Sequence, residues 1–390
     1  MIDKEIGNLI KKEDARQKSV VNLIASENIV SADVLEALGS VLTNKYAEGY
    51  PGARYYGGNT TVDEVERLCQ KRALAAFGLS DQKWAVNVQP HSGSPANLAV
   101  YLALVPPGEK IMGMELAHGG HLTHGQKVSI TGKIWQQVPY GVSADTEMLD
   151  YVALEKLAKK EKPKIIVAGY TAYPRIIDFK KFRKIADAAG AYLMVDMSHF
   201  AGLVAGGCYP SPFEYADVVT ATTHKTLRGP RAALIWSKID ERELPKKIDK
   251  AVFPGIQGGP HENAIAAVAV CLGETMTPAF KKYAAQIIKN ARALSEELAR
   301  LGWRIISGGT DTHLILVDVW NGGIGIGGKE ASERLEKEGI IANKNTIPFD
   351  SRKPVDPSGI RLGTAAETTK GAKEVDMLKI ARRIDDILKR

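Results

Sequence analysis

The chain has 390 residues, of which 44% are hydrophobic and 25% are charged, the balance of a soluble globular protein. This length predicts a large domain and a smaller one. Three widely separated cysteines, Cys69, Cys208 and Cys271, argue against a disulfide framework or a structural zinc and favour a cytoplasmic protein. The polar segment Met1–Lys12 and the lack of a long apolar run predict neither secretion nor membrane insertion.

A net charge of +7 raises the question of a polyanionic partner. A nucleic-acid-binding surface clusters Lys and Arg with aromatic or turn residues, whereas the densest basic run, Lys159–Lys164, is typical of the solvated end of a helix. We therefore expect mainly solubility charge and no dedicated nucleic-acid partner. An anion-attracting surface for an acidic substrate or cofactor remains the alternative.

From about residue 60 to 240, strand-like runs alternate with helical ones. Thr61–Glu64 predicts a capping box that opens a helix closed by Gly78. Ile165–Gly169 is predicted to be a buried strand, and Asp178–Ala189 an amphipathic helix ended by Gly190. This alternation predicts an α/β fold with a doubly wound, mostly parallel sheet.

The remaining sequence predicts a smaller C-terminal α+β domain. Pro278–Arg300 is a long helical pattern, followed by predicted strands at Trp303–Ser307 and Thr312–Val319 and predicted helices at Lys329–Glu338 and Lys373–Lys389. We expect an N-terminal arm or helical segment over residues 1–40, a large domain over 41–275 and a small domain over 276–390. The formal G-x-G-x-x-G at Gly323–Gly328 is interpreted as a flexible loop and not as a dinucleotide site.

Two side chains at predicted strand ends point to the chemistry. The apolar run Ala191–Val195 ends on Asp196, and the run Asp217–Ala221 leads into a hydroxyl-rich turn that holds Lys225. The carboxyl ends of parallel strands form the ligand-binding edge of such sheets. A lysine there can bind an aldehyde as a Schiff base, and an acid can keep a pyridine nitrogen protonated. The sequence therefore predicts a pyridoxal-phosphate enzyme.

Three further motifs fit this interpretation. Ser92–Pro95 precedes a helical run and leaves backbone N–H groups for a phosphate, although alone it would be an ordinary helix cap. The histidines at 118, 121 and 124 invite a zinc hypothesis, but no nearby cysteine or acid completes the ligand set. Stacking of one imidazole on the cofactor ring is the better use.

Two more motifs supply acid and cation. The Gly-rich loop Tyr46–Gly58 holds four tyrosines and Glu48, which would serve as a proton donor. Arg361 lies between glycines on a short predicted strand and would form a fork for a substrate carboxylate, although a lone arginine is usually on the surface.

At these residues the chain resembles the serine hydroxymethyltransferase family from about Asn22 to the last helix. The motifs occur in the family's order: Leu23–Asn28, Tyr46–Gly58, Gln89–Ser94, Leu116–Gly125, Thr222–Arg231 and Gln257–Pro260. The resemblance implies the fold of the pyridoxal-phosphate-dependent transferases and a homodimer with shared active sites, or a pair of dimers.

The resemblance also implies residue roles. Lys225 would carry pyridoxal 5'-phosphate as a Schiff base, with Asp196 on the pyridinium and His121 stacked on the ring. Thr222 would help Lys225 exchange with the substrate amine, and Glu48 would manage protons. The further cofactor-binding residues would be Tyr46, Ser92, Gly93, Ser94, Thr171, His199, His224, Arg231 and Gly259; Ser26, Glu48, Tyr56 and Arg361 would bind the amino acid, and Leu116, Gly120, Leu122 and Asn345 would face the pterin. Tyr46, Glu48, Tyr56 and Gly259 would reach in from the partner subunit.

The implied reaction moves the hydroxymethyl carbon of L-serine to a tetrahydropterin such as tetrahydrofolate, leaving glycine, with no metal. Two choices stay open: whether the pterin is folate or a modified one such as methanopterin, and whether the carbon moves by direct transfer or by a retro-aldol route. The closest alternative is a pterin-independent aldolase for threonine or another β-hydroxy amino acid, and a remote one is an RNA-binding protein with an inactive site. Ser198 stands where relatives usually carry alanine, and we expect this change to affect packing only.

Overall fold

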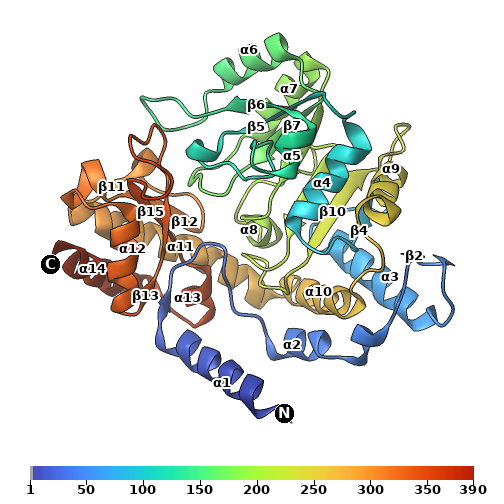
Figure 1. Ribbon diagram of the computed structural model, residues 1–390, viewed down its shortest axis with the longest axis horizontal. Helices are drawn as coiled ribbons and strands as arrows, with labels where there is room; N and C mark the ends of the chain where they lie inside the picture. Colours follow the sequence, from blue (N-terminus) through green and yellow to red (C-terminus); the bar gives the residue numbers. More distant parts are fainter. Residues whose placement is uncertain (1–2) are drawn as a thin grey trace. The chain divides into compact units, whose positions relative to one another are not determined.

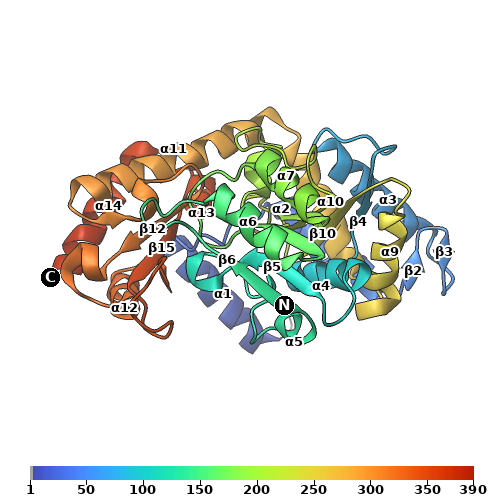
Figure 2. The same cartoon turned by 90° about the horizontal axis from the view of Figure 1, so that it is seen from above.

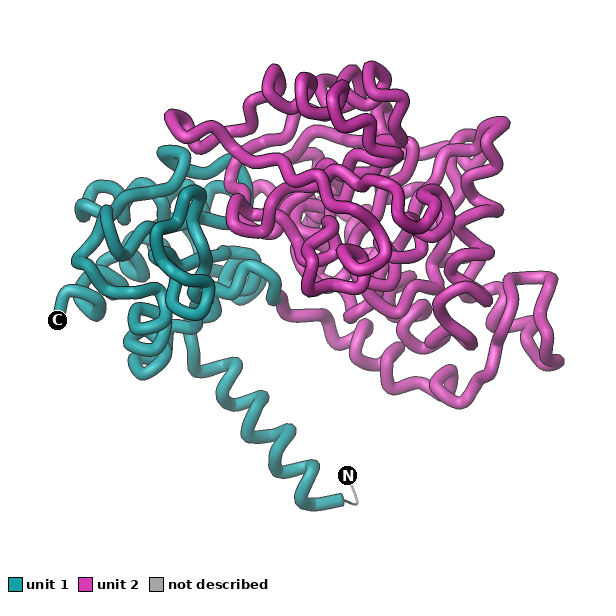
Figure 3. Tube along the Cα trace, turned by 45° about the horizontal axis from the view of Figure 1, so that its top comes forward, with its two compact units in different colours: residues 1–27, 286–390 teal, residues 28–285 magenta. Residues whose placement is uncertain are grey.

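The computed structural model describes residues 3–390 and divides them into two units. Unit 2 comprises residues 28–285, and unit 1 combines the segment up to Glu27 with residues 286–390 (Figure 3). The boundary lies within helix α11 (Pro278–Arg300), so one helix belongs to both units.

A seven-stranded sheet organises unit 2 (Figure 1). Its spatial order is β4 (Trp84–Asn87), β10 (Ala233–Lys238), β9 (Val218–Thr222), β8 (Tyr192–Asp196), β7 (Ile165–Gly169), β5 (Lys110–Met114) and β6 (Gln136–Tyr140). The five strands from β9 to β6 are parallel, and β10 is antiparallel to both β9 and β4. The predicted doubly wound, mostly parallel sheet is confirmed, and β4, β7, β8 and β9 all end at the same edge.

Helices cover both faces of this sheet. On one face, Ile235 of β10 shares a core with Ala96 of α4 and Leu244 of α9. The next residue, Trp236, points to the opposite face, where its ring contacts Phe77 and its Nε1 donates to the carbonyl of Ala73. The helices of unit 2 are α2 (Ala32–Leu38), α3 (Thr60–Ala75), α4 (Gly93–Leu104), α5 (Ile130–Ile134), α6 (Tyr151–Glu161), α7 (Phe179–Ala189), α8 (Ala201–Ala205), α9 (Leu244–Lys250) and α10 (Glu262–Thr275).

Local sequence explains where helices begin and end. In α7, the Asp178 carboxylate accepts from the Lys181 N–H, and Gly190 ends the helix in the left-handed region at φ 66°, as a C-terminal glycine does. Helix α3 forms as predicted, but the capping box does not. Its N-cap is Asn59, so Thr61 lies within the first turn and not at the cap position, and the neighbouring Asp63 side chain accepts from Gly52 and Arg54.

Unit 1 contains a four-stranded antiparallel sheet in the order β11 (Arg304–Ile305), β12 (Leu314–Asp318), β15 (Gly359–Gly363) and β14 (Asn343–Asn345). Helices α11, α12 (Gly328–Lys337) and α14 (Glu374–Lys389) pack around it (Figure 2). Its apolar core includes Leu298, Val317 and Ile384. Unit 1 also holds α1 (Lys4–Ser19), α13 (Ala365–Thr369) and the parallel pair β1 (Val21–Asn22) with β13 (Ile340–Ile341).

No single helix within residues 3–390 is both long and apolar enough to cross a bilayer. Helices α10 and α11 meet that measure only when taken together, and they are bent by 83° at their junction.

Candidate active site

The carboxyl edge of the seven-stranded sheet gathers most of the predicted residues of unit 2. Asp196 is the last residue of β8 and Thr222 is the last of β9. Thr171 follows β7, and His199 follows β8. The Ser92–Ser94 turn follows β4, which runs in the same direction as β9. Parallel strands therefore bring together residues that are more than a hundred positions apart.

Asp196 is held by three donors. Asn97 Nδ2 lies 2.8 Å and His124 Nε2 3.1 Å from its Oδ2, and the Ser198 N–H donates to Oδ1 at 3.1 Å. Burial opposes ionisation, but the hydrogen bond and charge of His124, followed by His121 and Ser198, hold the pKa of Asp196 well below its usual range. The side chain is therefore an anchored carboxylate at neutral pH.

Lys225 lies three residues after the end of β9, in the turn expected from the sequence. Its Nζ donates to Thr222 Oγ1 at 3.2 Å, and its backbone carbonyl accepts from Asn28 Nδ2 at 2.8 Å. Ser198 Oγ accepts from the Thr222 N–H at 3.1 Å. Ser198 thus touches both the Asp196 carboxylate and the Thr222 backbone, so it does more than the packing role that we expected.

The start of α4 is shaped for an anion. Its N-cap Ser92 makes no side-chain capping hydrogen bond, and the first N–H groups of a helix attract phosphate. A Cβ added to Gly93 would lie 2.6 Å from Thr222 Cγ2, so only glycine fits beside that strand end. Nearby, the buried His224 Nδ1 has no hydrogen-bond partner, and burial with the charges of Lys225 and Arg231 lowers its pKa to about 3. Arg231 itself is exposed.

The histidine loop lies over the same edge. His121 Nδ1 is 2.7 Å from Thr123 Oγ1, and burial lowers its pKa to about 4, which leaves a neutral imidazole at pH 7. The Gly119 carbonyl accepts from the backbone N–H groups of Thr171 and Ala172 at 2.7 and 3.1 Å. This pairing fixes the loop that holds Leu116, Gly120 and Leu122, of which Leu122 is 44% exposed.

A second group of predicted residues lies on the segment 46–58, which we call the arm. Its hairpin pairs β2 (Gly49–Tyr50) with β3 (Ala53–Arg54). Tyr46 Oη donates to Glu48 Oε1 at 3.2 Å, and the Tyr46 and Tyr56 rings meet edge to face at 5.0 Å. A Cβ on Gly258 would lie 3.1 Å from Glu48 Oε1, and one on Gly259 would touch Tyr46. Tyr46 and Tyr56 remain 55% and 51% exposed in the single chain.

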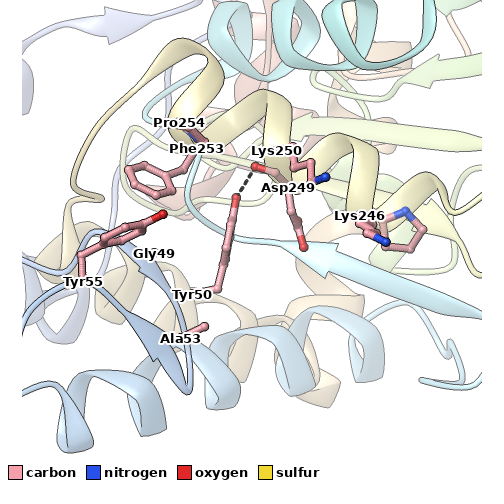
Figure 4. A pocket seen from close by; sticks show the side chains of 10 residues that line it. Gly49, Tyr50, Ala53, Tyr55, Lys246, Asp249, Lys250, Phe253 and Pro254 are labelled. Atoms are coloured by element: carbon pink, nitrogen blue, oxygen red, sulfur yellow. Dashed lines mark hydrogen bonds between the residues drawn. The ribbon is translucent and has the colours of Figure 1, made fainter.

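A cavity of about 550 Å³ separates the arm hairpin from α9 and the turn that follows it (Figure 4). Tyr55 and Phe253 meet edge to face at one end, and Tyr50 Oη donates to the Asp249 carbonyl at 2.7 Å. Burial raises the pKa of the Asp249 carboxyl to about 6, although a hydrogen bond from Asn87 opposes the shift.

The remaining predicted residues belong to unit 1. Arg361 is buried on β15, its Nε donates to Asn343 Oδ1 at 3.1 Å, and burial lowers its pKa to about 10. The Leu23 carbonyl accepts from the Gly363 N–H at 2.7 Å, and Ala25 leaves no room for a Cβ on Gly363. Ser26 therefore lies close to the end of the strand that carries Arg361. Asn345 is on the neighbouring strand β14.

Sequence reasoning missed Asn97 and His124 as partners of Asp196. Asn97 is 2% exposed and also bonds Thr123 Oγ1 and Thr220 Oγ1, at 2.9 and 2.8 Å. A polar residue on an otherwise apolar helix, two positions after a phosphate-type turn, was the available signal. For His124, the three-residue spacing of the histidines suggested a zinc site and gave no indication of a carboxylate partner.

Comparisons with known proteins identify the family of this chain. A sequence model of serine hydroxymethyltransferase matches residues 1–384. The serine hydroxymethyltransferase of Desulfotalea psychrophila (strain LSv54 / DSM 12343) is 55% identical over 386 residues, which are 99% of this chain and 88% of that protein. The same residues that predicted a pyridoxal-phosphate site thus lie within a full-length match, and the chain belongs to the serine hydroxymethyltransferase family.

Proposed function

We propose that this chain transfers the hydroxymethyl carbon of L-serine reversibly to tetrahydrofolate, giving glycine, as a cytoplasmic homodimer that uses pyridoxal phosphate. The observation that carries the proposal is the anchored Asp196 carboxylate at the same sheet edge as Lys225 and the start of α4. Family membership supplies the reaction, and the residue roles below are our assignment.

The site's own residues fit the cofactor. The partnerless His224 Nδ1, the uncapped start of α4 and the tight Gly93 turn would hold the phosphate. When bound, pyridoxal phosphate supplies an aldehyde for an amine and a ring that withdraws electrons from the amino-acid carbon. Asp196 would hold a proton at the ring nitrogen, because a carboxylate with three donors stays ionised beside a cation.

Two histidines of the site, His121 and His224, have lowered pKa values and are therefore uncharged at neutral pH. With a pKa of about 4, His121 presents an uncharged ring at neutral pH. His224, with a pKa of about 3, would donate a neutral hydrogen bond to the phosphate. Thr222 Oγ1, at 3.2 Å, orients Lys225 Nζ and would steady it while the substrate amine takes its place.

Substrate recognition would use residues of this chain and of a second subunit. Arg361 remains a cation at neutral pH and would clamp the serine carboxylate beside Ser26. Glu48 would move the proton of the serine hydroxyl or of the pterin, and Leu116, Gly120, Leu122 and Asn345 would face the pterin. The half-exposed Tyr46 and Tyr56 and the absence of any buried residue on α1 support a covering partner chain.

The test is serine turnover with a panel of tetrahydropterins that includes tetrahydrofolate and tetrahydromethanopterin. We expect glycine to form only when a tetrahydropterin is added, with tetrahydrofolate the preferred acceptor. Lys225→Ala is the blank and should lose all turnover. Glycine formation from serine without any pterin would instead favour the aldolase alternative.

A further inference from the structure

A buried group of three carboxyls and one guanidinium lies behind the arm. Asp63 and Glu66 come from α3, Glu262 from the first turn of α10 and Arg54 from β3. Their side chains are 13%, 0%, 0% and 5% exposed, in that order. Apart from the exposed Arg67, which lies 3.8 Å from Asp63, one guanidinium faces three acids that water scarcely reaches, and buried charges require partners.

Arg54 connects this group to Glu48. Its Nη1 donates to the carbonyls of Ala47 and Gly49, the residues on either side of Glu48, at 2.7 and 2.9 Å. The Glu48 carbonyl accepts from the Tyr55 N–H at 3.1 Å. Three successive carbonyls are therefore held, and the Glu48 side chain leaves the arm from a fixed backbone.

Glu66 anchors Arg54 from below. It accepts from Arg54 Nη2 at 2.5 Å, and Gln89 Nε2 lies 3.2 and 3.1 Å from its two oxygens. Gln89 Nε2 also donates to the Gly49 carbonyl at 2.9 Å. Glu66 therefore accepts hydrogen bonds from Arg54 and Gln89, the two side chains that donate to carbonyls of the arm.

Glu262 is in the opposite situation. Neither of its carboxyl oxygens has a hydrogen-bond partner, and the closest cation, Arg54 Nη2, is 3.8 Å away, beyond hydrogen-bond range. A buried carboxylate without donors is far costlier than the neutral acid, which carries its own donor. Burial and then the Glu66 charge raise the pKa of Glu262, in agreement with this geometry.

We infer that Glu262 is kept as a neutral carboxylic acid that donates to Glu66 and, through Glu66 and Arg54, positions the backbone of Glu48. The inference deepens the proposed function and rests on it for the role of Glu48. Glu262 is a positioning residue, since it acts through the arm. The titratable or charged groups that face it are Arg54 on the arm, Asp63, Glu66 and Cys69 on α3, and His261 beside it at the start of α10.

The first experiment asks whether the acid is protonated. Infrared spectra of the holoenzyme at pH 7.5 should contain the C=O stretch of a protonated carboxylic acid, and Glu262→Gln should remove it. Glu64→Gln, at an exposed position on α3, the helix that carries Glu66, is the matched control and should leave the band intact. If the spectrum of Glu262→Gln still contains every carboxylic-acid band of the wild type, the inference is overturned.

The second experiment asks whether this proton positions Glu48. Glu262→Gln keeps a donor toward Glu66 and should retain kcat within about twofold, without any alkaline loss that comes from ionisation of Glu262. Glu262→Leu removes the donor at similar volume and should lower kcat about tenfold, the loss expected for one misplaced catalytic contact. In a double-mutant cycle with Glu48→Gln, the two losses should not add. Additive losses, or wild-type kcat in Glu262→Leu, would refute the positioning role.

Two outcomes are separable from failure of the proposed function. If Glu48→Gln leaves turnover unchanged, the assigned role of Glu48 fails, and the infrared band still decides the protonation of Glu262. If Glu262→Leu does not fold, Arg54→Lys replaces it in the cycle, because lysine keeps the charge but cannot hold both carbonyls beside Glu48. Wild-type kcat in Arg54→Lys would then overturn the link to Glu48.

Discussion

Replacing Gly93 by alanine tests the phosphate-binding turn with one added carbon. The new Cβ would lie 2.6 Å from Thr222 Cγ2, whereas carbon atoms in contact are about 3.5–4.0 Å apart. The first turn of α4 or the Thr222 side chain must therefore shift by about 1 Å. Thr222 is bonded to Lys225 and to Ser198, so either movement disturbs the site.

The size of the effect follows from the cost of overpacking. Such a clash costs about 1–3 kcal/mol, and each 1.4 kcal/mol corresponds to about tenfold in affinity. The cofactor-free protein can relax, and alanine gains up to about 1 kcal/mol over glycine in a helix. Its stability should therefore change little, whereas binding of pyridoxal phosphate requires the original geometry and should weaken about tenfold to a hundredfold.

The assay is titration of the cofactor-free protein with pyridoxal phosphate, followed by absorbance, beside thermal unfolding. Gly39→Ala is the control, since its closest neighbour would be the Leu35 carbonyl at an ordinary 3.6 Å, and it should bind the cofactor like wild type. Cofactor affinity of Gly93→Ala within about twofold of wild type, inside the spread of a neutral substitution, would refute the reasoning.

Three further predictions concern other parts of the chain. Asp249 has a pKa of about 6 in the folded state, so as the pH rises the unfolded chain loses this proton at a lower pH than the folded chain does. The free energy of unfolding of the wild type should therefore fall relative to that of Asp249→Asn between about pH 4 and 6, by about 3 kcal/mol. Urea unfolding from pH 4 to 7 measures this, and a constant difference would contradict it. Ser198→Ala leaves the Thr222 N–H without its acceptor and should cost about 1–2 kcal/mol in thermal unfolding; no change would return Ser198 to a packing role. Arg361→Lys should raise the KM for serine about tenfold or more through loss of the planar fork and leave the cofactor absorbance unchanged, and a normal KM would remove Arg361 from the carboxylate site.

Much of the fold was predictable because its signals are local. Ile165–Gly169 and Pro278–Arg300 have the predicted bounds, since an uninterrupted apolar run or a long helical period leaves few alternatives. Asp196 and Lys225 were predictable for a related reason. The end of a parallel strand fixes where the following side chain lies, so position along the chain translates directly into position at the sheet edge.

What escaped prediction depends on contacts between distant segments. The capping box predicted at Thr61–Glu64 does not form, because Asn59 and not Thr61 is the N-cap. Asp63 accepts hydrogen bonds from Gly52 and Arg54, contacts that the local sequence does not indicate. Glu262 is separated from Glu66 by almost two hundred positions, so a shared buried proton cannot be inferred from either helix alone. The same holds for Asn97, because its hydrogen bond to Asp196 depends on how α4 packs beside β8.

The most direct test of the central claim is to locate the covalent attachment of the cofactor. Holoenzyme reduced with borohydride, digested and analysed by mass spectrometry should carry the phosphopyridoxyl group on Lys225 alone, and addition of L-serine before reduction should decrease that labelling. Attachment to a different lysine, or no attachment at all in protein that turns over serine, would contradict the account.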